Sequence, residues 1–144
     1  MSGWVTAKSW LLRPGAAPRP DLGLLVLRLW FGLSLAFGHG AAKLFSMERF
    51  TASVTRHGFP LPEVTAPIAM LSELAGGLLI ALGLATRPAA LFVLSTMLGA
   101  AFVAHGGDPF SKKELALAFG AAALVVLVAG PGRYSLDARL AGRR

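Results

Sequence analysis

The chain has 144 residues, of which 55% are hydrophobic and only 15% are charged, whereas soluble domains carry about 25% charged residues. This composition favours a single-domain membrane protein, and the absence of cysteine excludes disulfides, thiolate metal sites and a cysteine nucleophile. The net charge of +7 does not indicate nucleic-acid binding, because the basic residues lie at segment ends and in the tails rather than along one helix face.

Four apolar stretches follow an N-terminal tail of residues 1–21 and predict the fold. The tail does not have the pattern of a signal peptide, since Lys8 and Arg13 interrupt its apolar patches. The stretches cover residues 22–42, 66–84, 88–104 and 113–130, and a spanning helix needs about 20 apolar residues. We therefore expect an all-α integral membrane fold. It would be a four-transmembrane-helix bundle over residues 22–137, followed by a basic C-terminal tail at residues 138–144.

The connections between these stretches differ in length. Residues 43–65 are partly amphipathic and are broken by Gly58 and two prolines, which predicts an interfacial helix followed by a turn. The second and third stretches are separated only by residues 85–87, which predicts a helical hairpin. The segment 37-FGHG-40 resembles 102-FVAHG-106, and such an echo is what a repeat of two hairpins would produce.

Basic residues predict the orientation. With four spans both tails lie on one side, and the tails together with the short turn carry eight Lys and Arg residues, against five on the other face. The positive-inside rule then places both termini in the cytoplasm. The expected protein is a multi-pass protein of the bacterial inner membrane, with residues 43–65 and 106–113 outside.

Five ionisable residues lie within or beside the apolar stretches. Arg28 interrupts the first and Glu73 the second; His39 and His105 lie near the ends of the first and third, and Glu114 opens the fourth. A charge at mid-bilayer costs roughly 2.5–3.5 kcal/mol, so such residues face the bundle interior, find partners and mark functional sites.

Arg28 and Glu73 are predicted to pair, because opposite charges on neighbouring spans at compatible depths satisfy each other. The alternative interpretation is that this ion pair only fixes which helices pack together and binds no substrate. Gly32, Gly76 and Gly77 are predicted packing positions, where small residues let helices approach closely.

A polar cavity is expected at the outer end of the bundle, lined by His39, Glu73, His105 and Glu114. In an alternating bundle these four residues fall within about two helical turns of one depth. Arg28 should lie below His39 on the same helix face, since eleven residues are close to three full turns. No metal is expected, because the chain lacks close-spaced pairs such as HxxxH or ExxH.

Three segments and two single residues carry a family likeness: 27-LRLWFGLSLAFGHGAAKLF-45, 73-ELAGGLLIALGLATR-87, His105, Glu114 and 130-GPGRYSLD-137. This ordered set resembles the DoxX family of small bacterial membrane proteins over roughly residues 22–137. The resemblance implies a four-helix membrane bundle. It also implies a polar site, without assigned catalytic roles, at Arg28, His39, Lys43, Glu73, His105, Glu114 and Arg133.

The family takes its name from a subunit associated with a quinol oxidase and with thiosulfate:quinone oxidoreduction, and other members resemble membrane anchors for redox and stress partners. The leading hypothesis is therefore a redox-associated subunit whose cavity binds a small ligand such as a quinone head group. His39 or His105 with Arg28 could donate to the quinone oxygens, and Glu73 or Glu114 could take the protons.

Two alternatives stay open: a non-catalytic scaffold that recruits redox or stress-response partners, and a small solute transporter or channel. The sequence does not decide whether the chain is an accessory subunit of a quinone-linked oxidoreductase. It leaves catalytic residues unassigned, and it leaves homo-oligomerisation open.

Overall fold

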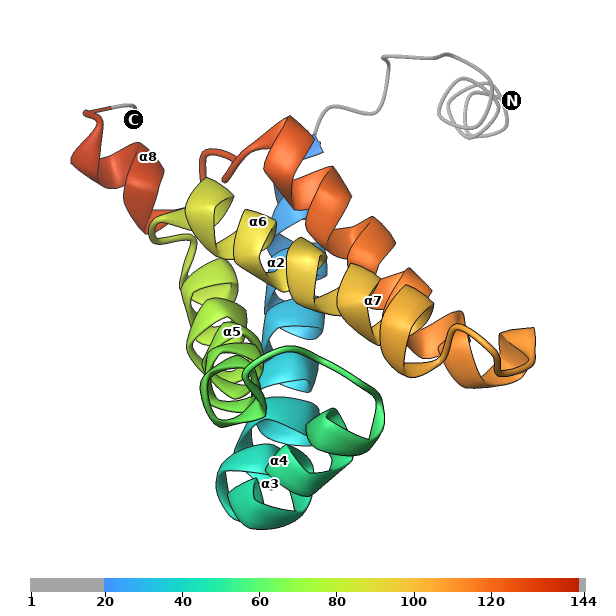
Figure 1. Cartoon of the computed structure of the whole chain (residues 1–144). Helices are drawn as coiled ribbons and strands as arrows, with labels where there is room; N and C mark the ends of the chain where they lie inside the picture. The colour runs from blue at the N-terminus through green and yellow to red at the C-terminus, as the bar shows by residue number, and fades with distance from the viewer. Residues whose placement is uncertain (1–19, 143–144) are drawn as a thin grey trace, which may run out of the picture.

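The structure, a computed structural model, describes residues 20–142, and over this range its regular structure is helical (Figure 1). The elements in chain order are α2 (Pro20–Leu35), the π-helical turn η1 (Ala36–Gly40), α3 (Ala41–Leu44), α4 (Met47–Arg56), α5 (Pro62–Leu82), α6 (Thr86–Gly99), the π-helical turn η2 (Ala100–Ala104), α7 (Phe110–Ala129) and α8 (Leu136–Leu140). The predicted tail of residues 1–21 lies outside the described residues except for Pro20 and Asp21, which begin α2. The predicted C-terminal tail begins inside α8, and its last two residues also lie outside the description.

Among the described residues, three helical stretches are long and apolar enough to cross a membrane: Pro20–Leu44, Pro62–Leu82 and Thr86–Ala104. They correspond to the first three predicted spans. The first stretch is continuous because η1 and α3 extend α2 with helical backbone angles at each junction. A turn at residues 83–85 joins α5 to α6, so the predicted hairpin is confirmed.

The fourth predicted span corresponds to α7, which begins at Phe110 and not at Lys113 or Glu114 as the sequence suggested. Pro109 precedes it with extended backbone (φ −62°, ψ 157°), the conformation of an N-cap residue, so the helix starts at the next residue. Three charges therefore lie in the first turns of α7. The uncharged remainder, residues 115–129, is about 22 Å long at 1.5 Å per residue, against about 30 Å for a hydrocarbon core. A fourth crossing stays a prediction.

Helices α2 and α5 cross with backbone against backbone. A Cβ on Gly32 would overlap the Gly77 carbonyl oxygen, and a Cβ on Gly77 would lie 2.7 Å from the Gly32 carbonyl oxygen. Gly76 faces the Val93 side chain of α6, where a Cβ would lie 3.0 Å from Cγ2. The three glycines named from the sequence thus let α5 approach both α2 and α6.

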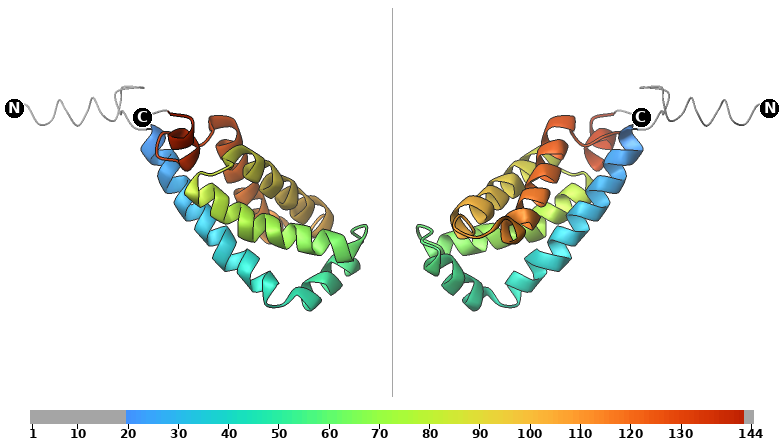
Figure 2. Two further views of the ribbon diagram at one scale, coloured as in Figure 1. Left: turned by 90° about the vertical axis from the view of Figure 1, so that its left-hand side faces the viewer. Right: turned by 90° about the vertical axis from the view of Figure 1, so that its right-hand side faces the viewer.

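The bundle has two ends of different character (Figures 1 and 2). At the α8 end, the start of α2, the α5–α6 turn and α8 lie together. At the α4 end, α2 and α5 diverge, and α3 and α4 connect them. The helix-then-turn predicted within residues 43–65 is found there as α4 and residues 57–61, while its position at a membrane interface stays a prediction. Between the ends lies an apolar core of Phe31, Leu35, Ile80, Ala89, Ala90, Val93, Met97, Ala123 and Val126.

Within residues 20–142, two π-helical turns lie at two of the three His-Gly dipeptides, those at residues 39–40 and 105–106. His39 is inside η1, and His105 follows η2 directly. A π turn holds one residue more than an α turn, so it rotates the residues that follow about the helix axis. The prediction that Arg28 and His39 share a face is therefore wrong: Gly40 packs against the backbone of Leu74 on α5, and His39 turns away.

Candidate functional site

Glu73 and Lys43 form an ion pair at the α4 end. Lys43 Nζ, from α3, donates a hydrogen bond to Oε1 of Glu73 on α5, whose side chain is 3% exposed. The ammonium also lies 4.8 Å from the centroid of the Phe50 ring, a cation–π contact that holds it in place. The second carboxylate oxygen, Glu73 Oε2, is buried and has no hydrogen-bond partner among the described residues.

Arg28 is not the partner of Glu73, and that prediction is wrong. Because Gly32 lies opposite Gly77 in an antiparallel crossing, Arg28, one turn before Gly32, lies beside Gly83 just past the end of α5. Glu73 precedes Gly83 by ten residues, roughly 15 Å along a helix. The two charges therefore occupy opposite ends of the bundle.

Arg28 is enclosed at the α8 end. Its side chain is fully buried, and Nη2 donates a 2.8 Å hydrogen bond to the Tyr134 carbonyl oxygen. Nε and Nη1 have no partner among the described residues, although Asp137 provides a nearby opposite charge. Gly83 has a left-handed backbone (φ +69°), and a Cβ there would overlap the guanidinium. The same glycine thus ends α5 and leaves room for the arginine.

A pocket of about 500 Å³ lies beside the Lys43–Glu73 pair, between α4, α5 and α6, and we call it the α4 pocket. It is lined by Lys43, Phe50, Ser53, Val54, His57, Phe59, Thr65, Ile68, Ala69, Glu73, Phe92, Ser95, Thr96, Gly99, Ala100, Ala104 and His105. Its walls are mostly apolar and aromatic, with a few polar groups that converge on one space. This is the general character of small-molecule sites.

His105 reaches this pocket with its ring oriented by Asp108. Nδ1 of His105 lies 2.8 Å from Asp108 Oδ2, so the carboxylate accepts a hydrogen bond from Nδ1–H, and Nε2 is not part of this contact. This hydrogen bond, together with the charge of Lys112, holds the pKa of Asp108 below its ordinary value. Sequence reasoning missed Asp108, although its place three residues after His105 was a usable signal. It also missed His57, whose ring lies 6.2 Å from that of His105.

The structure leaves His39 and Glu114 outside the α4 pocket. The His39 ring packs edge-on against Phe119 of α7, with ring centroids 5.3 Å apart, and Glu114 is exposed on α7. The predicted convergence of four residues is therefore found for Glu73 and His105 and not for the other two. Within residues 20–142, no group of three or more His, Asp or Glu side chains is placed to hold a metal ion.

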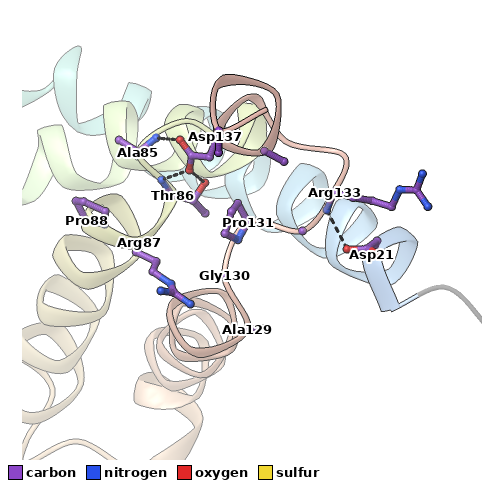
Figure 3. Close-up of a pocket in the computed structure, with 13 residues that line it drawn as sticks. Asp21, Ala85, Thr86, Arg87, Pro88, Ala129, Gly130, Pro131, Arg133 and Asp137 are labelled. Carbon is purple, nitrogen blue, oxygen red and sulfur yellow. Dashed lines mark hydrogen bonds between the residues drawn. The ribbon is translucent and has the colours of Figure 1, made fainter. Parts of the chain in front are cut away.

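A second pocket, of about 650 Å³, lies between the loops at the α8 end, and Figure 3 shows it. This α8 pocket is lined by Asp21, Ala85, Thr86, Arg87, Pro88, Ala129, Gly130, Pro131, Gly132, Arg133, Asp137, Ala138 and Ala141. Arg133, which the family resemblance marked, lines this pocket and not the α4 pocket. Its side chain extends away from Asp137 in Figure 3.

Both carboxylates of the α8 pocket are engaged by the backbone. Asp137 accepts hydrogen bonds from the Ala85 and Thr86 amides, each at 2.9 Å, and from the Thr86 hydroxyl at 2.7 Å. Asp21 accepts one from the Arg133 amide at 2.9 Å. Burial alone would raise the pKa of Asp137, but the hydrogen bonds from Thr86 and Ala85 outweigh it and hold that pKa below its ordinary value. Through these hydrogen bonds the two carboxylates stabilise the packing of the loops against the helix ends.

Fold and site together define a helical membrane protein with an ion pair buried beside a pocket of small-molecule size. The family model for DoxX matches residues 23–106, which is more than half of the chain. The chain is 30% identical to the inner membrane protein YphA of Escherichia coli K12 over 132 residues, which cover 85% of this chain and 93% of that protein. It is 31% identical to the inner membrane protein YqjF of the same strain over 123 residues, covering 81% and 91%.

No solved structure matches the chain. The chain belongs to the DoxX family, and the resemblance seen in its sequence is confirmed. It is a DoxX-type inner membrane protein.

Proposed function

We propose that this protein is a redox-associated membrane subunit whose α4 pocket binds a small ligand, specifically a quinone head group. The pocket volume of about 500 Å³ falls within the roughly 300–1,000 Å³ typical of ligand sites. Phe50, Phe59 and Phe92 offer flat apolar walls for a ring, and Lys43 and Glu73 offer polar groups for its oxygens.

The observation that carries the proposal is the unpartnered oxygen of Glu73. A buried polar atom without a hydrogen bond is rare in folded proteins and costs about 1–3 kcal/mol. The hydroxyl of a bound quinol would donate to Glu73 Oε2 and remove that cost. Lys43 Nζ is a donor for an oxygen of the oxidised ring, and the imidazole of His105 lines the same pocket.

The redox part of the proposal divides the work between two proteins. Oxidising a quinol to a quinone releases two electrons and two protons. We assign the protons to the Glu73 carboxylate and to Nε2 of His105, which line the pocket and would accept them, and the electrons to a redox-protein partner. In this scheme the chain binds and deprotonates the ligand and does not itself carry electrons.

Binding of a tritiated quinone to the purified protein in lipid nanodiscs tests the proposal. Glu73→Gln and His105→Gln should each weaken binding by about tenfold, equivalent to about 1.4 kcal/mol. Glu114→Gln and His39→Gln are matched controls, since they make the same chemical changes outside the pocket, and they should change binding by less than about twofold. Equal effects of both pairs would contradict the site. Absence of quinone binding together with a stoichiometric soluble partner would favour a scaffold.

We also propose that α7 is a fourth span, that α4 lies at the membrane interface and that both termini are cytoplasmic. The support is the apolar part of α7 and the eight-to-five split of basic residues. Single cysteines at Ser2, Ala52 and Ser111 of this cysteine-free chain would report sidedness to an impermeant thiol reagent. We expect labelling at Ala52 and Ser111 in intact cells and protection at Ser2. The reverse pattern would invert the orientation.

A further inference from the structure

The α4 pocket is elongated along one spanning helix. Its lining on α6 and η2 extends from Phe92 to Ala104, about 18 Å at 1.5 Å per residue. His57 and His105 lie at the loop end of this groove. The groove therefore reaches from the α4 end of the bundle well into the membrane-spanning part of α6.

Glu73 lies partway along the groove and not at its mouth. Its neighbour Ser72 accepts a 2.9 Å hydrogen bond from the Thr96 hydroxyl. This bond shows that Glu73 on α5 lies at about the same depth in the bundle as Thr96 on α6. Thr96 precedes Ala104 by eight residues, about 12 Å of helix. A ligand head group that meets Glu73 is thus about two turns inside the spanning helices.

The groove is covered at its loop half and open on the outer surface of the helices. Phe59 packs over Gly99, with Cε1 3.5 Å from the position a Cβ would take. By contrast, Phe92 is 61% exposed, Ile68 is 51% exposed, and Ser95 is also exposed. These three lining residues belong to the helices Pro62–Leu82 and Thr86–Ala104, which are apolar enough to cross a membrane. Their exposed surface would face lipid.

Ser95 keeps this opening clear. It is small, and its hydroxyl donates a 2.9 Å hydrogen bond to the Leu91 carbonyl of its own helix, so it offers lipid no free polar group. Ala69 and Gly99 are the neighbouring small residues of the lining. A hydrocarbon chain could pass between α5 and α6 at this point without displacing a large side chain.

We propose that the α4 pocket takes its ligand sideways from the bilayer through the opening at Ile68, Phe92 and Ser95. The ligand is an amphiphile that places a polar head at Glu73 and leaves a hydrocarbon tail in the lipid between α5 and α6. This inference rests on the proposed ligand-binding function and names the class of ligand and its route.

Two quinones with the same head group test the route, one with a ten-carbon tail and one with a methyl group in its place. Binding of each is measured to the full-length protein in lipid nanodiscs. Ser95→Trp, which fills the opening, should weaken the tailed quinone by about tenfold, because the tail loses its path. The tail-less quinone should change by less than about twofold, because its bound head lies at Glu73 and leaves the opening unoccupied.

Leu98→Trp is the matched control, since Leu98 is exposed on α6 but does not line the groove. It should leave both quinones unchanged. Ser95→Leu is a second variant with a side chain suited to lipid, and it should show the same selectivity at smaller amplitude. Size-exclusion profile and helical content confirm that each variant is folded.

The outcomes separate this inference from the proposed function. If the wild type binds both quinones and Ser95→Trp leaves the tailed one unaffected, the lateral route is wrong and the ligand site stands. If both Ser95 variants weaken the two quinones equally, the opening is not specific for a tail and the inference is again overturned. If the wild type binds neither quinone, the proposed function is wrong and the inference falls with it.

Discussion

The two ends of the bundle each hold a buried charge, but they enclose it differently. At the α8 end, the Arg28 guanidinium lies against Gly83 and donates to the Tyr134 carbonyl, and it does not line the neighbouring pocket. At the α4 end, Glu73 is nearly as buried, yet it lines a pocket of about 500 Å³, and one of its oxygens has no partner within residues 20–142.

The difference lies in what surrounds each charge. Carboxylates at the α8 end are occupied by backbone amides at Ala85, Thr86 and Arg133, so that end joins helices and loops. The carboxylate at the α4 end receives one side-chain donor and borders empty space. Burial alone therefore does not distinguish the two charges; access from a pocket does.

Replacing Gly83, which lies against Arg28 at the α8 end, should lower the free energy of unfolding more than any other change considered below. Gly83→Ala adds a left-handed alanine and a Cβ that overlaps Arg28 and lies 2.5 Å from Ser135 Cβ, for a combined loss of roughly 3 kcal/mol. The measurement is the free energy of unfolding in detergent micelles. Gly58→Ala at the α4 end is the control, because Gly58 has a similar φ of +75° but nothing within 4 Å. It should cost about 1 kcal/mol, and equal losses would contradict the closed end.

Replacing Asp137 should cause the second-largest loss in the free energy of unfolding. Asp137→Ala removes three hydrogen bonds to the start of α6 and the charge near Arg28, and it should lower the free energy of unfolding by about 2 kcal/mol. The lowered pKa of Asp137 means that its contribution is present above its ordinary value of 3.8 and is lost as the pH falls through the folded-state pKa.

The wild type should therefore lose stability as the pH falls below about 4, and Asp137→Asn should lack that part of the decline. Asp21→Ala removes the one hydrogen bond that Asp21 accepts from the Arg133 amide within residues 20–142, and it should cost about half as much as Asp137→Ala. A pH profile of Asp137→Asn that follows the wild type would show that the carboxylate is not engaged.

The ion pair at the α4 end should show as an energetic coupling. A double-mutant cycle with Lys43→Met and Glu73→Gln should give a coupling of about 1 kcal/mol in the free energy of unfolding, because each single change leaves the other group unpaired. The cycle of Arg28→Met with Glu73→Gln is the control and should be additive, since those residues lie at opposite ends. Coupling between Arg28 and Glu73, with none between Lys43 and Glu73, would contradict the structure and support the Arg28–Glu73 pair expected from the sequence.

The smallest effect should come from Asp108. Asp108→Asn should lower stability only slightly, because Asp108 is at the surface, but it should alter the ring of His105, whose Nδ1–H donates to the carboxylate. Nitrogen-15 NMR of labelled histidine should report a defined Nδ1–H tautomer in the wild type and a mixture in the variant. His57, whose Nδ1 contacts the Ser53 carbonyl at 2.7 Å, should keep its signals. Unchanged His105 signals would exclude Asp108 as the orienting group.

Much of the site could be anticipated from the sequence, and the misses have identifiable causes. Glu73 and His105 could be recognised as candidates because an ionisable side chain within or beside an apolar span is energetically costly and usually has a partner or a function. His39 was misplaced because the π turn at Ala36–Gly40 rotates it toward Phe119, and no residue pattern announces that turn. Lys43 was predicted as a site residue only through the family resemblance. Its position directly after the first apolar stretch is typical of a lysine exposed to solvent at the end of a span.

The sequence by itself determined the class of protein, its family and its three long apolar helices, because continuous apolar runs have few other stable solutions. It also marked Gly32 and Gly77, since close helix crossings need small residues. Only the tertiary structure decided which charges meet. The antiparallel crossing at those glycines separates Arg28 from Glu73 and brings Lys43 to it. Pairing depends on where two helices cross along their lengths, and that position is a property of the packed bundle.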